Sequence, residues 1–286
     1  MVMKLNHRYL VKLALATGLA LFTAGLVRAQ HGHLNVGAVE PVQGSLLFWA
    51  NGSEFIETSG YVKTLEHAAT GRYAGYYQGG ITLTALPATA AHAGPDPDAP
   101  ALGAYVHFRM ACLEGPPQGS FQFWDSTGTT PAESLVPGET GTNLWVLSEN
   151  EGLPGTDPYG HIHGRRFTAT KPGLYRIGFT AYDLSDNGEG GGPIHAPSGE
   201  LAVWFQAGVN IRDVEPDFAE GHVHVHFGAQ AGYRWQVEFS LDLGSLADWR
   251  PAGNAVEGQD IFVELIHDLP PGTRRYYRVV GTPIIP

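Results

Sequence analysis

Cysteine is nearly absent from this chain of 286 residues, which contains only Cys112. A single cysteine excludes an intrachain disulfide, and its position leaves no lipid-attachment cysteine after an N-terminal signal. Cys112 lies in an apolar segment, so we expect it to be a core residue. The fold must therefore be stabilised by its hydrophobic core or by a bound metal ion.

Long apolar runs are missing too, apart from one near the N-terminus. Basic residues precede the apolar stretch at 13–27, and the small-residue sequence Val27-Arg28-Ala29 follows it. This pattern predicts a secretory signal peptide over residues 1–29, with the mature chain beginning at Gln30. No second run of about 20 apolar residues follows. We therefore expect an extracytoplasmic protein (secreted, periplasmic or at the cell surface) without an integral membrane segment in the mature chain.

Positive charge is scarce in the predicted mature chain. The full sequence has a net charge of −11, and loss of Lys4, Arg8, Lys12 and Arg28 with the signal peptide makes it −15. This acidic balance argues against nucleic acid as a partner. Twelve of the thirteen histidines remain, against only two lysines. That imbalance is the first indication of metal chemistry, although charge alone also fits a protein that is simply soluble.

Catalytic motifs are missing as well. The sequence contains no Gly-x-Ser-x-Gly elbow, no His-Glu-x-x-His and no glycine-rich phosphate loop before a helix. We therefore predict that the protein is not an enzyme. A zinc-dependent hydrolase that uses His161, His163, a third ligand and a bound water is an alternative. The sequence indicates no general base for it.

Glycine and proline are abundant, with 38 and 20 residues, which argues against long helices. Segments of alternating apolar and polar residues recur between clusters of Gly, Pro, Asn and Asp, as in antiparallel strands. The predicted fold class is all-β, with two antiparallel β-sandwich domains of the immunoglobulin or fibronectin kind. The expected strands include 102–111, 120–125, 174–181, 201–206, 221–227, 233–240, 261–266 and 276–280.

A domain boundary is predicted near residues 210–219, where the polar sequence Asn-Ile-Arg-Asp-Val-Glu-Pro-Asp separates two strand-rich blocks. After the signal peptide at 1–29, this gives a His-x-His β-sandwich domain at 30–210 and a small C-terminal β-sandwich module at 211–286. Residues 61–69 fit a helical turn or two. Asn51-Gly52-Ser53 fits either a glycosylation acceptor or a hairpin turn.

The histidines carry the predicted chemistry because they occur in His-x-His groups. In a strand, residues two apart point to the same face about 6.5 to 7 Å apart, so two imidazoles can converge on one ion. We predict His161 and His163 as the best ligands, with His31 and His33 next. The weaker candidates are His195, in a loop that could approach the His161 pair, and His222, His224 and His226.

Each group also fits a structural role. A single His-x-His on a strand is compatible with a solvated polar face, and the pair His31 and His33 is compatible with a mobile terminus. Against the second reading, residues 34–37 look like a first strand, which places both histidines at its start. In the group at 222–226 the intervening valines face the core. That group becomes a metal site only if an acid or a fourth imidazole approaches it.

Longer motifs surround two of these groups. The sequence His161-Ile162-His163 precedes Phe167 and Thr170-Lys171-Pro172-Gly173-Leu174-Tyr175, while Gly32-His33-Leu34-Asn35 stands near the mature N-terminus and Leu144-Trp145-Val146-Leu147 lies between them. Over much of residues 31–207 these motifs resemble bacterial surface-anchored proteins encoded beside metal transporters, some under zinc-responsive repression. The resemblance implies a metal-binding surface protein. Its candidate partners are a metal ion and a metal transporter or other cell-surface component.

The sequence departs from that family in two respects. Asn35 stands where those proteins usually have an acid, which weakens the case for a ligand at this position. The final Gly-Thr-Pro-Ile-Ile-Pro does not look like a sorting or anchoring tail. Instead, residues 232–240, Asp248-Trp249 and 275–279 resemble small C-terminal β-modules of secreted bacterial proteins, which implies display or packing rather than catalysis.

Several choices remain open at this point. Zinc is the predicted metal, and Cu²⁺ or Ni²⁺ also suits imidazole ligands. A carbohydrate- or matrix-binding structural protein is the main alternative function, with Trp49, Trp124 and Tyr76-Tyr77 as its anchors. The Gly-rich loop at 183–189 could instead hold calcium, although its spacing misses the EF-hand order.

Overall fold

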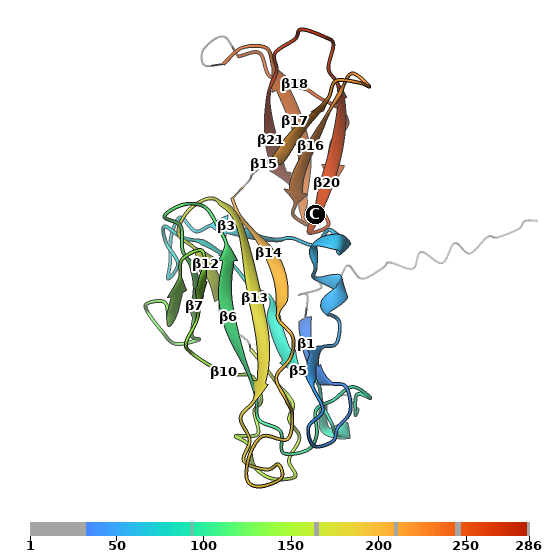
Figure 1. Cartoon of the computed structure of the whole chain (residues 1–286). Helices are drawn as coiled ribbons and strands as arrows, with labels where there is room; N and C mark the ends of the chain where they lie inside the picture. The colour runs from blue at the N-terminus through green and yellow to red at the C-terminus, as the bar shows by residue number, and fades with distance from the viewer. Residues whose placement is uncertain (1–32, 93, 163–165, 209–210, 244–246, 285–286) are drawn as a thin grey trace, which may run out of the picture. The chain divides into compact units, whose positions relative to one another are not determined.

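The computed structural model describes residues 33–92, 94–162, 166–208, 211–243 and 247–284. The predicted signal peptide, His31 and His163 lie outside the described residues. The described chain is all-β, as predicted, and its helical elements are the short 3-10 helices η1 (Gly52–Glu54), η2 (Glu57–Ser59) and η3 (Ala90–His92) (Figure 1). None of its described helices has the length and apolar character needed to cross a membrane.

A four-stranded sheet carries His33 and His161. Its order is β11-β5-β1-β2, with β1 at His33–Ala38, β2 at Leu47–Trp49, β5 at Thr82–Ala85 and β11 at Gly160–His161. In Figure 1, β1 (blue) runs beside β5 (cyan), and the two strands are parallel. Because side chains alternate between faces, one face buries Leu34 and Leu83 in the core. The other face is left for polar side chains.

A ten-stranded sheet forms most of the remaining structure up to residue 207. Its order is β10-β6-β13-β14-β3-β4-β12-β7-β8, and β9 pairs with β6. The strands are β3 (Lys63–His67), β4 (Tyr77–Gly79), β6 (Val106–Glu114), β7 (Phe121–Trp124), β8 (Glu133–Leu135), β9 (Glu139–Thr140), β10 (Trp145–Val146), β12 (Arg166–Ala169), β13 (Gly173–Asp183) and β14 (Leu201–Ala207).

This sheet curls until its two ends meet. Trp145 on β10 donates its indole N–H to a carboxylate oxygen of Glu133 on β8, at 2.9 Å, and its ring lies 4.9 Å from that of Phe123 on β7. The result is a nearly closed, barrel-like sheet. Its interior is filled by fully buried aromatic side chains such as Phe179 and Phe205. Burying one such side chain stabilises the fold by about 1.5 to 3 kcal/mol.

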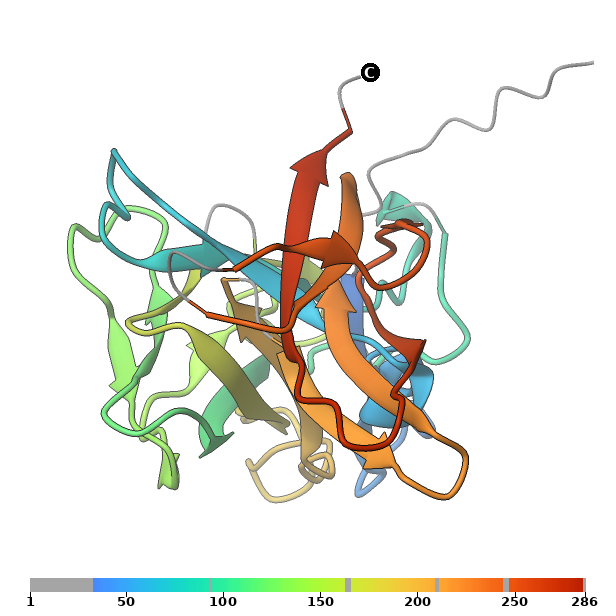
Figure 2. The same cartoon turned by 90° about the horizontal axis from the view of Figure 1, so that it is seen from above.

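The C-terminal strands form two further sheets, drawn in orange to red in Figures 1 and 2. One has the order β15-β16-β20, with β15 at Ile211–Asp217, β16 at His222–Ala229 and β20 at Ile261–Asp268. The other joins β17 (Tyr233–Ser240), β18 (Arg250–Pro251), β19 (Val256–Glu257) and β21 (Tyr276–Pro283). Val225, Phe227, Trp235 and Val237 from the two sheets share one hydrophobic cluster.

The strands expected from alternation are confirmed, although several ends differ by a few residues; the strand expected at 174–181, for example, is β13 at Gly173–Asp183. Cys112 is a buried, free core residue, as expected. The helical expectation for residues 61–69 is wrong, because β3 lies there between β14 and β4 and buries Leu65. The polar segment near residue 210 contains the strand β15.

Two parts of the fold prediction remain predictions. The arrangement as two immunoglobulin-like sandwiches is finer than the all-β architecture observed. The domain boundary near 210–219 also stays a prediction, since the described residues from His33 onward group into one compact unit.

Candidate metal centre

The sheet β11-β5-β1-β2 brings two predicted ligands from distant parts of the sequence to one strand. His161 on β11 pairs with Thr84 of β5, while β1 on the other side of β5 sets His33 opposite Thr82. Paired residues on adjacent strands share a face, and Thr82 and Thr84 share one because they are two apart. His33 and His161 therefore lie on the same face. The Nδ1 of His33 is 3.1 Å from the Thr84 hydroxyl oxygen, so the imidazole leans over β5.

The side chain of Asn51 fixes the backbone around His33. Its Nδ2 donates to the His33 carbonyl at 2.7 Å, and its Oδ1 accepts from the backbone N–H of Asn35 at 2.9 Å. The start of β1 thus has side-chain hydrogen bonds as well as its strand pairing to β5. This role corrects the sequence interpretation of Asn51-Gly52-Ser53 as a hairpin turn, since Asn51 precedes η1 and Gly52 and Ser53 belong to it.

His161 owes its position to a close backbone approach at Gly160. A Cβ atom at residue 160 would lie 2.1 Å from the Leu147 carbonyl oxygen and 2.6 Å from the Glu149 nitrogen, so only glycine fits there. The Glu149 N–H donates to the Tyr159 carbonyl at 2.9 Å. This contact brings the Glu149 carboxylate to 3.4 Å from Nδ1 of His161. Glu149 is a functional candidate that the sequence reasoning missed, because nothing in the sequence signals this approach.

Asp157 anchors the segment that leads into β11. Its carboxylate accepts the backbone N–H groups of Ala88, Thr89 and Tyr159 and the Thr89 hydroxyl. Partial burial would raise the pKa of Asp157, but these hydrogen bonds outweigh it and hold the pKa below its ordinary value. The carboxylate is therefore ionised at neutral pH and serves as an anchor for the turn before Gly160.

The described side chains on the face around β5 do not by themselves complete a cation site. Within the described ranges, no three side chains of His, Cys, Asp and Glu stand at metal-binding spacing. His31 and His163, two positions along the sequence from His33 and His161, lie outside those ranges. The described part of the face contributes two imidazoles, the Glu149 carboxylate and the Thr84 hydroxyl. Imidazole and carboxylate are ligand types that zinc takes in proteins.

His195 does not extend toward the His161 group. Its side chain is buried, with Nε2 accepting from the backbone N–H of Ala101 at 2.9 Å and Nδ1 lying 3.2 Å from the Ser45 carbonyl oxygen. The second contact requires a proton on Nδ1, so the neutral tautomer satisfies both partners. Burial lowers the pKa of His195 and outweighs the opposing effects of Ser45 and Asp183. In the observed arrangement both ring nitrogens of His195 already form hydrogen bonds to the backbone, so neither is available to a metal ion.

The three histidines of β16 meet carboxylates, the condition under which the sequence allowed a metal site there. His222 has a carboxylate oxygen of Asp268 3.2 Å from its Nδ1. His224 and His226 both approach Glu264 on β20, and Nδ1 of His226 also contacts Asp213 on β15. Val223 and Val225 are buried on the other face, as predicted.

The carboxylates around β16 favour the protonated form of His226, and the histidines favour the ionised form of Glu264. Partial burial would lower the pKa of His226, but its hydrogen bonds and charge interactions with Asp213 and Glu264 outweigh it and raise the pKa. The hydrogen bond from His224 is the largest effect that lowers the pKa of Glu264, which thus stays ionised. The carboxylates have the charge that would also attract a metal cation.

In the loop at 183–189, the alternative calcium site, the carboxylate of Asp183 is not available to a cation. Asp183 is buried, and its two oxygens accept backbone N–H groups from Tyr105, Ser185, Ile194 and His195. Burial would raise the pKa of Asp183, yet these hydrogen bonds outweigh it and lower the pKa. Asp183 thus ties the loop at 183–195 to Tyr105, the residue before β6, and both of its carboxylate oxygens already accept hydrogen bonds.

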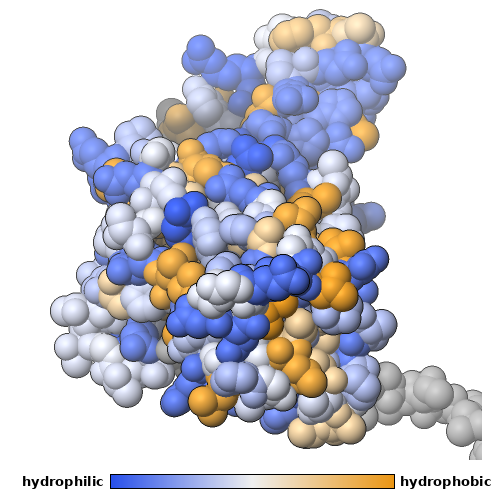
Figure 3. Space-filling model, turned by 60° about the horizontal axis from the view of Figure 1, so that its bottom comes forward, coloured by the Kyte–Doolittle hydropathy of each residue, from blue (hydrophilic) through white to orange (hydrophobic). Residues whose placement is uncertain are grey.

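Of the aromatic anchors of the carbohydrate alternative, the two tryptophans are buried, and Tyr76 and Tyr77 are partly buried. Trp49 and Trp124 are 8% and 2% exposed, and their indole N–H groups donate to the Phe179 carbonyl and the Thr168 hydroxyl. Tyr76 packs edge-on against Trp124. Neither tryptophan therefore offers a free ring face for a sugar. On the side drawn in Figure 3, apolar residues form separate patches among polar ones.

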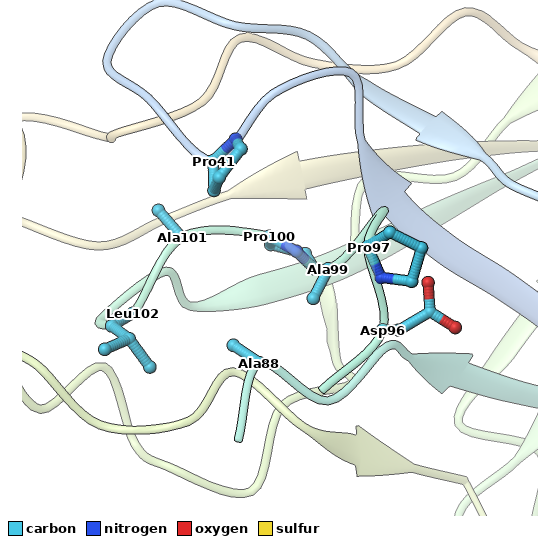
Figure 4. Close-up of a pocket in the computed structure, with 8 residues that line it drawn as sticks. All are labelled: Pro41, Ala88, Asp96, Pro97, Ala99, Pro100, Ala101 and Leu102. Carbon is cyan, nitrogen blue, oxygen red and sulfur yellow. The ribbon is translucent and has the colours of Figure 1, made fainter. Parts of the chain in front are cut away.

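A hollow of about 490 Å³ between loops also lacks such a platform (Figure 4). Its lining is largely proline and alanine, with Asp96 as the charged group: Pro41, Ala88, Asp96, Pro97, Ala99, Pro100, Ala101 and Leu102. Sugar sites normally combine an aromatic ring with several polar groups. This lining provides neither.

No family model matches the sequence, and no curated protein matches it at a significant level.

Proposed function

We propose that this chain is a non-catalytic, extracytoplasmic protein that binds a divalent transition metal, zinc first, on the face of β5 between His33 and His161. The observation that supports the proposal is the arrangement β11-β5-β1. It sets one member of each of two predicted His-x-His groups on either side of Thr84. We further propose two immunoglobulin-like sandwiches as the framework that carries this face.

The spacing suits two imidazoles that share one ion. Neighbouring strands lie about 4.8 Å apart, and His33 and His161 stand opposite residues of β5 that are two apart, or about 7 Å along the strand. Their backbones are therefore about 12 Å apart across β5. Two imidazoles that lean toward each other can close this gap, and His33 already leans toward Thr84. In the proposal His163 joins His161 as a ligand, with His31 as the next candidate, and Glu149 adds a carboxylate.

Access and charge also support this location. His33 is exposed, the His161 side chain is 22% exposed and Glu149 is 56% exposed, so an ion can reach the face from solvent. Two neutral imidazoles with one carboxylate give a mixed nitrogen and oxygen ligand set, which suits zinc and also Cu²⁺ or Ni²⁺. The acidic surface raises the local concentration of cations.

Zinc titration of the mature chain tests the proposal. The metal-stripped protein, purified without a histidine tag, should take up about one zinc ion at this face, and His33→Ala with His161→Ala should abolish that uptake. His67→Ala is the matched control, because His67 is an exposed histidine on β3 that packs edge-on against Tyr77. Zinc uptake that is the same in the double variant and in wild type would remove the proposed site.

A further inference from the structure

The sheet β15-β16-β20 presents a second group of histidines whose surroundings differ from those at β5. The three histidines alternate along β16, and each lies in a row across the three strands. The rows are Asp217–His222–Asp268, Glu215–His224–Ile266 and Asp213–His226–Glu264. Paired residues share a face, so five carboxylates surround three imidazoles on this surface.

Glu264 is the point where two of these imidazoles converge. One of its carboxylate oxygens lies 2.7 Å from Nδ1 of His224 and 3.2 Å from Nε2 of His226. The two histidines are two residues apart on one strand, so both rings reach across to β20 on the same face. Two imidazole nitrogens therefore meet at one carboxylate oxygen, which places three potential ligand atoms from three side chains close together.

Asp213 orients the His226 ring from the opposite side. It contacts Nδ1 of His226, which leaves Nε2 directed at Glu264. A carboxylate that holds one imidazole nitrogen while the other nitrogen binds a metal is the usual outer shell of histidine metal sites, where it fixes the tautomer and the ring plane. The arrangement at His226 has this outer shell in place.

We propose that His224, His226 and Glu264 form a second divalent transition-metal site, with Asp213 as the positioning residue behind His226. It uses different residues from the face at β5 and does not depend on the function proposed there. Two imidazoles and one carboxylate, with solvent in the fourth position, constitute a normal zinc ligand set.

In the observed arrangement these three side chains, like all others in the described ranges, do not yet stand at metal-binding spacing. The distances between their atoms show how far the ligands must move. Ligand atoms bound to zinc at 2.0 to 2.2 Å in a tetrahedron lie about 3.4 Å from each other. The separation of 3.2 Å between His226 and Glu264 is close to this value, and that of 2.7 Å between His224 and Glu264 must lengthen by about 0.7 Å. All three side chains are between 27% and 45% exposed, so they can make this shift.

An ion can also reach these ligands. His224, His226 and Glu264 line an open hollow of about 560 Å³, together with Glu215, Pro216, Asp217 and Phe218. The additional carboxylates raise the local concentration of cations. Phe218 is 82% exposed at the rim. No large rearrangement of the strands is needed for entry.

The test uses the metal-stripped mature chain and zinc alone as the probe, followed by calorimetry. In the background His33→Ala with His161→Ala, any remaining uptake reports this second group. We expect about one further zinc ion in that background, and its loss on His224→Ala with His226→Ala or on Glu264→Gln. Glu257→Gln, at an exposed carboxylate of β19 paired with Arg234, should change nothing.

Asp213→Asn tests the positioning role, because it keeps all three ligands. It should retain the ion with an affinity about tenfold lower.

Circular dichroism and thermal unfolding of each variant establish that it is folded. Absence of zinc uptake in the folded background variant would overturn the proposal, as would uptake that is unchanged by the β16 double variant or by Glu264→Gln. If only the β5 site is wrong, wild type and the background variant should take up the same amount of zinc. Glu264→Gln in that background should still remove this uptake.

Discussion

The side chain of Asn51 holds the backbone of His33 from across β1. Its Nδ2 donates to the His33 carbonyl at 2.7 Å and its Oδ1 accepts the N–H of Asn35 at 2.9 Å, so one amide brackets the residue that carries the imidazole. The position of His33 at the edge of the proposed metal face depends on this amide. A change at residue 51 should therefore act on metal binding without touching a ligand.

Asn51→Ala is the first prediction. Loss of its two hydrogen bonds should reduce the free energy of unfolding by about 1 to 3 kcal/mol and weaken zinc binding at the β5 face about tenfold. Calorimetry and thermal unfolding measure the two effects. Asn187→Ala is the matched control, because the Asn187 side chain likewise makes two hydrogen bonds to the backbone, donating to the carbonyl groups of Gly103 and Gly152. It should lower stability alone. Equal effects of both variants on zinc affinity would contradict the role of Asn51.

Gly160→Ala should displace His161. The new Cβ would lie 2.1 Å from the Leu147 carbonyl oxygen, so the backbone must move, at a cost of about 1 to 3 kcal/mol of stability or more. We expect loss of zinc binding at the β5 face in the folded fraction. Gly199→Ala is the control, since no atom lies within 4 Å of its added Cβ. Wild-type zinc affinity in folded Gly160→Ala would show that His161 does not depend on this approach.

Buried neutral histidines predict a loss of stability in acid. Burial lowers the pKa of His107 and His195 in the folded protein. Below the unfolded value near 6.5 the unfolded chain takes up protons that the folded chain does not, so stability falls as the pH drops through that value toward the folded pKa. The slope is at most about 1.4 kcal/mol per pH unit for each histidine.

Urea unfolding of the metal-free protein at pH 7.5, 6.5 and 5.5 measures this slope. His195→Gln should make it shallower, because an amide can accept from Ala101 and donate to Ser45 without titrating. An unchanged slope in that variant would mean that His195 contributes nothing to it.

The two strand-rich blocks should separate at residue 210. Because β15 pairs with β16, a cut before Ile211 keeps both C-terminal sheets whole. The fragment 30–210 should then fold alone and bind zinc at the β5 face. Limited proteolysis followed by calorimetry on the fragment tests this. If the fragment does not fold, the two blocks form one cooperative unit.

Alternation was sufficient to predict most strands, but not those whose environment is set by distant partners. β15 has the mostly exposed pattern of an edge strand and includes Pro216, so its sequence resembles a polar linker, although proline is tolerated at a sheet edge. β3 lacks a clear alternation because Thr64 and Leu65, adjacent in sequence, are both buried.

The proposed metal face was predictable from the sequence only in part. The His-x-His spacing identifies His33 and His161 as candidates, because it depends on local strand geometry alone. That these two groups share β5 depends on the strand order β11-β5-β1, and the parallel pairing of β1 with β5 has no local sequence signature. The same holds for Glu264, which reaches His224 and His226 through the pairing of β16 with β20.

Zinc affinity at the β5 face should depend steeply on pH. Imidazole binds metal only when neutral, so with a reference pKa near 6.5 each ligand must lose its proton, and affinity should fall between about pH 7 and pH 5. For two histidines the limiting slope is about two protons displaced per ion, or roughly 2.7 kcal/mol per pH unit. Titrations at pH 7.5, 6.5 and 5.5 in His224→Ala with His226→Ala isolate this face. A flat profile would indicate carboxylate ligands instead.

The most direct test of the central claim is the zinc content of the metal-stripped mature chain after titration, compared between wild type and His161→Ala with His163→Ala. The proposed function predicts that the double variant, although folded, binds one zinc ion fewer per chain than wild type. Equal zinc content and equal affinity in the two proteins would contradict it.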